Sequence, residues 1–218
     1  MRHPWIVLIY SIAMGVLEAA VVVYLRRIYY PAGFGLPLVA MDPFVLRVEI
    51  AREAATIVMI ACVALLAAPQ PWSRLMAFLV VFGAWDLAYY AGLKLWLGWP
   101  ARLFEPDILF LIPKVWVGPV IAPALVAATW VAGGLLLHRR RFRDLRMGWK
   151  SWAAAIAAAA LILASFLGPL GPAGEMRFSW GIYLAGYALG LVTLARLIVL
   201  GRKAERRKAE PLRAKESA

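Results

Sequence analysis

Six long apolar runs restrict this chain to the class of helical membrane proteins. A membrane-spanning helix needs about 20 predominantly apolar residues, and each run approaches or reaches this length. Hydrophobic residues make up 64% of the 218 residues, a larger share than soluble domains contain. We therefore predict an all-α, multi-pass integral membrane protein with six transmembrane helices. The predicted helices cover approximately residues 4–25, 44–68, 74–97, 119–137, 151–167 and 178–200.

Basic residues beside these runs predict the orientation of the chain. Residues 138–150 contain six Lys or Arg, and residues 202–218 contain seven. Cytoplasmic segments are enriched in these residues, so both segments and, by the parity of the helices, the N-terminus are predicted to be cytoplasmic. We expect one transmembrane domain, residues 1–200, and a basic cytoplasmic tail, residues 201–218, in a bacterial-type inner (plasma) membrane. Because the net charge of +12 is concentrated beside apolar runs, we expect contact with membrane lipids and no nucleic-acid partner.

Charged residues within the first three predicted helices indicate a buried polar site. Glu49, Arg52, Glu53 and Thr56 share one helix face, because they recur three or four residues apart. At a rise of about 1.5 Å per residue, these residues and the charged residues of the other two helices lie between the bilayer centre and the outer face. Charges in lipid are unfavourable unless they are paired or face water, so we expect all three helices to turn them toward one pocket. The predicted substrate- or ion-binding residues are Glu18, Glu49, Arg52, Glu53, Asp86, Tyr89, Tyr90, Lys94, Asp107, Lys114 and Trp116.

The charge balance of the three helices suggests acid–base or cation chemistry. Four carboxyl groups face two cations, Arg52 and Lys94, so two carboxyl groups must be protonated, bind a cation, or pair with Arg26, Arg27 or Lys114. A carboxyl group that exchanges protons can act as a general acid or base. The candidate catalytic residues are Glu53, Asp86 and Glu18, and the candidate metal ligands, should a metal bind, are Glu49, Glu53 and Asp86. A structural network of ion pairs is the competing interpretation.

The outer segment 98–118 is apolar but contains several prolines, which exclude one continuous helix. We predict an interfacial or re-entrant segment that caps the pocket, and residues 29–37 are expected to help form a lid. Arg26 and Arg27 would lie on the outer side, against the positive-inside rule. They either extend to lipid headgroups or have a function there.

Small residues predict how the last two helices pack. Residues 153–160 read AAAIAAAA, and Gly186 and Gly190 are four residues apart, so the two helices can approach closely. A homodimer contact, or one within a larger membrane complex, is the alternative use of these faces. With one cysteine and two histidines, no haem, zinc or iron–sulfur site is expected within this chain.

Three classes of function fit these observations. The first is binding or transport of a small polar solute or ion, with or without proton coupling. The second is an intramembrane enzyme that uses carboxyl acid–base chemistry on a lipid or isoprenoid. In this respect FEPDILF, residues 104–110, partly resembles the P-x-E-x-x-L-F pattern of small membrane carotenoid cyclases, with a different spacing. The third is an accessory subunit of a membrane complex.

Overall fold

The computed structural model describes the whole chain except residues 2, 139–146, 168–176 and 217–218. The described residues form six α-helices and one two-stranded antiparallel sheet. The helices are α1 (Pro4–Tyr29), α2 (Pro43–Ala67), α3 (Pro71–Leu97), α4 (Ile121–Leu137), α5 (Trp149–Phe166) and α6 (Trp180–Glu216). The strands are β1 (Pro106–Phe110) and β2 (Trp116–Pro119).

The prediction of an all-helical fold is confirmed, and five of the six described helices, rather than all six, have the length and composition of membrane spans. Of the described helices, α1, α2, α3, α5 and the first 24 residues of α6 are long and apolar enough to cross a membrane. Helix α4 is apolar but has only 17 residues; it begins at Ile121, two residues after the predicted start at Pro119, which is the last residue of β2. At about 1.5 Å per residue, α4 is roughly 25 Å long, at the lower limit for a span.

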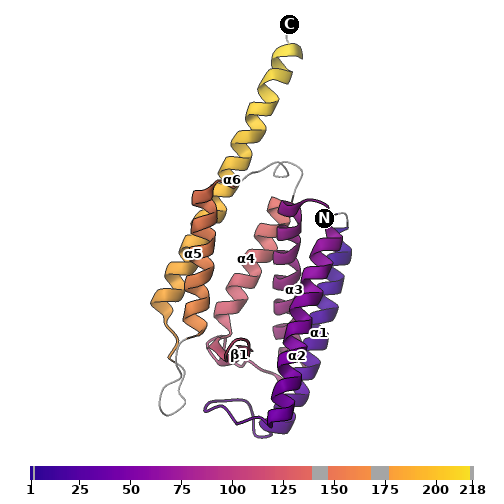
Figure 1. Cartoon of the computed structure of the whole chain (residues 1–218), viewed down its shortest axis with the longest axis vertical. Helices are drawn as coiled ribbons and strands as arrows, with labels where there is room; N and C mark the ends of the chain where they lie inside the picture. The colour runs from indigo at the N-terminus through magenta and orange to yellow at the C-terminus, as the bar shows by residue number, and fades with distance from the viewer. Residues whose placement is uncertain (2, 139–146, 168–176, 217–218) are drawn as a thin grey trace.

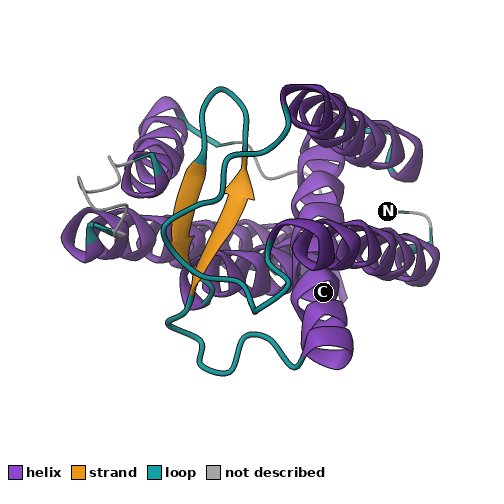
Figure 2. Ribbon diagram, turned by 90° about the horizontal axis from the view of Figure 1, so that it is seen from below, coloured by secondary structure: helices purple, strands orange, loops and turns teal. Residues whose placement is uncertain are grey.

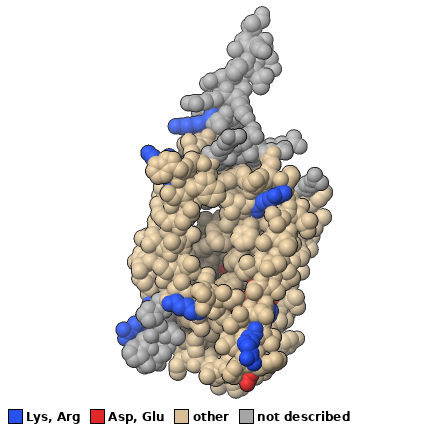
Figure 3. All heavy atoms as spheres, viewed as in Figure 1, with Lys and Arg blue, Asp and Glu red and all other residues tan. Residues whose placement is uncertain are grey.

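The helices run in alternating directions (Figure 1). Helices α1 to α4 form one bundle, and the α5–α6 pair lies beside α4. Both termini lie at one end of the molecule, and the β-hairpin lies at the other end. On the face shown in Figure 3, Lys and Arg lie toward the two ends, and a broad belt of other residues separates them.

Helices α1 and α3 approach each other closely, and this contact positions two acidic residues in the interior. A Cβ atom added at Gly15 would overlap the Trp85 carbonyl oxygen and lie 2.7 Å from the Ala88 Cβ. Only glycine permits this separation, which is the packing that small residues allow between membrane helices. Glu18 follows Gly15 by three residues and Asp86 follows Trp85, so the same contact brings both acidic residues into the interior.

Helices α5 and α6 pack against each other, as their small residues predicted. A Cβ atom added at Gly186 would lie 2.8 Å from the Leu161 Cβ and 3.0 Å from the Ala158 carbonyl oxygen. Helix α6 does not end near residue 200 but continues through the predicted basic tail to Glu216. Most of the basic segment 138–150 and of the predicted outer loop 168–177 lies outside the described residues.

Candidate functional site

The segment 98–118, for which the sequence predicted an interfacial or re-entrant segment, contains a β-hairpin. Strands β1 and β2 pair with Asp107 opposite Gly118 and Ile108 opposite Val117, and the register shifts between Ile108 and Phe110. The hairpin lies across one end of the helices (Figure 2). It therefore covers the end of the bundle, as the sequence predicted for this segment, but with a strand geometry that the sequence analysis did not predict.

A buried ion pair joins the hairpin to α1. Arg26 Nη2 donates a hydrogen bond to Asp107 Oδ1 at 2.7 Å, and the Tyr89 hydroxyl donates to Oδ2 at 3.2 Å. The Arg26 guanidinium lies over two rings, 4.3 Å from the centroid of Phe34 and 3.7 Å from that of Trp99. Burial raises the pKa of Asp107 to about 6, while Arg26 and Tyr89 oppose this increase. The contacts connect α1, α3, the hairpin and the segment between α1 and α2.

A second ion-pair group joins α2 to α1. Arg52 donates to Glu49 Oε2 at 2.8 Å through Nε, and its Nη1 donates to Glu18 Oε1. On the same face of α2, Glu53 Oε2 accepts a hydrogen bond from the Leu111 backbone N–H at 2.9 Å. The predicted stripe on α2 therefore faces inward, and its last carboxyl group contacts the hairpin.

Two adjoining cavities lie among these residues. The small cavity has a volume of about 50 Å³, and the large cavity has a volume of about 340 Å³. Glu18, Thr56, Asp86 and Tyr90 line the small cavity, and apolar side chains such as Leu38 form much of the wall of the large one. Both cavities are lined by Val22, Arg52, Glu53, Tyr89 and Ile108.

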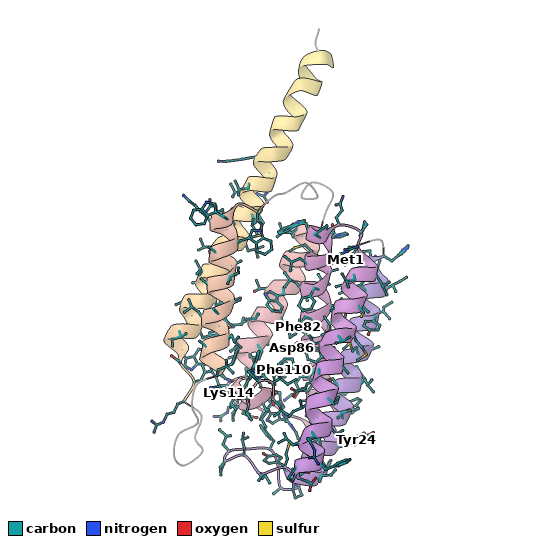
Figure 4. The ribbon with its side chains drawn as sticks, in the orientation of Figure 1. Met1, Tyr24, Phe82, Asp86, Phe110 and Lys114 are labelled. Carbon is teal, nitrogen blue, oxygen red and sulfur yellow. The ribbon has the colours of Figure 1, made fainter. Side chains whose placement is uncertain are left out.

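Among the acidic residues around the two cavities, Asp86 has the fewest compensating contacts in the described structure. Its side chain lines the small cavity, the residue is 9% exposed, and it has no hydrogen bond or ion pair with another described residue. The Tyr90 hydroxyl is buried nearby without a hydrogen-bond partner of good geometry. Asp86 and Phe110 lie in the interior where α3 meets the hairpin (Figure 4). One water needs roughly 10–15 Å³, so the small cavity has room for a few waters or for the polar group of a ligand.

Three predicted site residues lie elsewhere. Lys94 Nζ donates to the backbone carbonyl oxygens of Gly98 at 3.1 Å and Pro100 at 2.8 Å, so it completes the end of α3 and lines neither cavity. Lys114 is exposed in the hairpin turn. Trp116 packs against Phe110, with 5.2 Å between ring centroids.

The predicted metal ligands do not form a metal site. In the described part of the chain, no group of three or more His, Cys, Asp or Glu residues is placed to hold a metal ion. Glu49 instead bonds Arg52, and Glu53 bonds the hairpin backbone. Glu49 and Glu53 therefore do not converge with Asp86 on one position in the small cavity.

Arg26 is the main residue that the sequence analysis left out of the predicted site. The available signal was its predicted position at the outer end of the first helix, against the positive-inside rule. No feature of the sequence indicated that the backbone N–H group of Leu111 belongs to the site, because its position depends on the strand pairing.

Comparison of this chain with protein-family models, with curated proteins and with solved structures finds no match.

Proposed function

We propose that this protein binds a small amphipathic molecule in the two adjoining cavities and exchanges protons with it. The observation that carries this proposal is the unpaired Asp86 carboxyl group, which faces a small polar cavity next to a larger, mostly apolar one. Small-molecule sites typically have volumes of about 300–1,000 Å³ and contain a few convergent polar groups. The large cavity, at about 340 Å³, falls in this range.

The orientation that we propose follows from the basic segments 138–150 and 201–218, which favour the cytoplasmic side of a bacterial-type inner membrane. The hairpin then lies on the outer side, together with the Arg26–Asp107 pair. In this orientation a molecule would enter the large cavity from the outer half of the bilayer or from outside the cell.

The charges of the site support a division of roles. Arg52 is already bonded to Glu18 and Glu49, so it holds α1 and α2 together. Glu53 and Asp86 have no cationic partner among the described residues. They would therefore give up or take up protons as a polar group enters the small cavity, since charge in this environment must be offset.

Transport across the membrane would require a further movement of the helices. Between the site and the end of the bundle that carries the termini, the interior is filled by a core cluster of Val7, Met14, Ile60, Val81 and Trp85. Helices α1, α2 and α3 would have to separate there to open a second exit. The described conformation supports binding from the hairpin side. We propose that the protein uses this binding for transport.

The test is native mass spectrometry of the protein extracted in its surrounding lipid, with lipid extraction of the same sample. We expect a stoichiometric small molecule on the wild type that is lost in Asp86→Asn. The matched control is Asp42→Asn, which makes the same chemical change at the exposed N-cap of α2, where Asn is an equally good cap. A wild type that carries no molecule under these conditions, or equal occupancy in both variants, would contradict the proposal.

A second candidate function is favoured by the rings around Asp86. Trp85, Tyr90 and Phe110 line the small cavity with it, and aromatic faces stabilise positive charge. A protonated Asp86 could transfer its proton to a carbon of an isoprenoid double bond, which forms a C–H bond and a carbocation. Loss of a proton from a neighbouring carbon to water or to the Asp86 carboxylate would then yield an isomerised or cyclised product. Incorporation of deuterium into the lipid in heavy water by wild type but not by Asp86→Asn would identify this activity, and its absence would reject it.

A further inference from the structure

We propose that the polar group of the bound molecule is positively charged, so that the site takes an amphipathic amine. This inference rests on the proposed function, because it concerns the ligand of the same two cavities. It depends on the charged residues that line the cavities and on the pairing of both arginines with carboxyl groups.

Carboxyl groups outnumber cations around the two cavities. Five acidic residues and two arginines line them, which leaves an excess of three carboxyl groups in the described structure. Lys94, which the sequence assigned to this site, bonds backbone carbonyl oxygens at the end of α3 and does not reduce the excess. The residues that make up this balance are Glu18, Glu49, Glu53, Asp86, Asp107, Arg26 and Arg52.

Both guanidinium groups are already paired with carboxyl groups. Arg26 bonds Asp107, and Arg52 bonds Glu49 and Glu18. Arg26 Nη1 is buried without a partner and can still donate to a neutral oxygen, but the charge of Arg26 is offset by Asp107. An anionic group would therefore meet no uncompensated cation and would lie among carboxyl groups that already outnumber the cations.

A cationic group would find the opposite environment. Asp86 is nine-tenths buried, has no partner among the described residues and lines the small cavity, so its carboxyl group is placed to receive a positive charge. Glu53 lines the same cavity with one oxygen bonded to the Leu111 N–H. Trp85 and Tyr90 complete the wall, and a cation over an aromatic face gains additional stabilisation. The apolar part of the molecule would occupy the large cavity.

The experiment compares three amphiphiles with the same alkyl chain: octylamine, octanol and octanoate. Each is titrated calorimetrically into the full chain in phosphatidylglycerol nanodiscs, and the signal of protein-free nanodiscs is subtracted. We expect octylamine to bind most tightly. Asp86→Asn should weaken octylamine at least about 30-fold, since a charge at a mostly buried site loses its partner, and should change octanol much less. Asp42→Asn serves again as the matched control and should bind octylamine like wild type.

The outcomes separate this inference from the function on which it rests. Octanol or octanoate binding as tightly as octylamine would overturn the amine assignment while the binding function stands. Failure of all three to bind would overturn both. Asp86→Asn that keeps the melting temperature of wild type but binds octylamine equally well would also overturn the assignment. Once octylamine binding is established, repeating the titration with phosphatidylethanolamine in the nanodiscs tells the two sources of an amine apart: competition identifies a lipid headgroup, and its absence a free amine.

Discussion

Substitution of Arg52 by Gln should destabilise the protein because it removes the cation between two carboxyl groups. Arg52 bonds Glu49 and Glu18 and so connects α2 to α1. Removing one partner of a buried ion pair costs about 3–5 kcal/mol, since the remaining charge is left uncompensated. The Arg52 side chain is 22% exposed, so water reduces the loss, and we expect about 2–4 kcal/mol. For a chain of 218 residues, the melting temperature should fall by about 4–16 °C.

A double-mutant cycle with Glu18 tests whether the ion pair is the cause. In Glu18→Gln, Arg52 keeps its hydrogen bond to Glu49, so the expected loss is smaller, about 1–2 kcal/mol. The double variant Glu18→Gln/Arg52→Gln should lose no more than Arg52→Gln alone, because the second substitution removes a carboxyl group that no longer has a partner. The coupling energy between the two positions should lie at about 0.5–3 kcal/mol.

The assay is thermal unfolding of each variant in one detergent, followed by tryptophan fluorescence. Arg47→Gln is the matched control, because Arg47 is exposed on the same helix and its substitution should change stability by about 0.5 kcal/mol or less. If Arg52→Gln melts at the same temperature as Arg47→Gln, or if the losses of the two single variants simply add, the ion-pair reasoning is refuted.

Three further predictions concern other contacts of the fold. Gly15→Ala should lower stability by about 2 kcal/mol in thermal unfolding, since the new methyl group meets the α3 backbone. In Gly181→Ala the new methyl group meets nothing within 4 Å, so the higher helix propensity of Ala should raise stability by about 1 kcal/mol. Because the folded-state pKa of Asp107, about 6, lies above its ordinary 3.8, the free energy of unfolding should fall by about 3 kcal/mol as pH rises from about 4 to about 6, and Asp107→Asn should remove this slope. Lys94→Met should cost about 1 kcal/mol of stability, because it removes the two hydrogen bonds at the end of α3, and should leave ligand binding unchanged; reduced binding at unchanged stability would return Lys94 to the site.

The sequence predicted the parts of the site that depend on helix periodicity. Residues three or four apart on a helix share a face whatever the surrounding fold, so the inward stripe of Glu49, Glu53 and Thr56 followed directly from their spacing. The depth argument also predicted that Glu18 and Arg52 lie in the same half of the membrane, and the two residues are bonded to each other. These two quantities, phase and rise, are fixed by helix geometry and need no knowledge of tertiary structure.

The parts that the sequence analysis missed depend on long side chains and on strand pairing. Lys94 was assigned to the pocket by its helix face, but its flexible side chain reaches the carbonyl groups that the end of α3 leaves unpaired. Arg26 has a partner 81 residues away, and only the hairpin brings Asp107 to it. The prolines correctly excluded a continuous helix in segment 98–118, yet they do not distinguish a hairpin from an irregular loop.

The hairpin also connects α5, and through it α6, to a site to which the described parts of these two helices contribute no cavity-lining residue. None of the described residues of α5 or α6 lines the small or the large cavity. However, Gly118 on β2 lies against Phe166 at the end of α5, where an added Cβ atom would be 2.6 Å from the ring. Gly118 is opposite Asp107 in the strand register, and Asp107 bonds Arg26, so the hairpin links the Phe166 contact to the buried ion pair. We therefore expect that substitutions at the Gly118–Phe166 contact shift the hairpin and so change the proposed ligand binding, although neither residue lines the small or the large cavity.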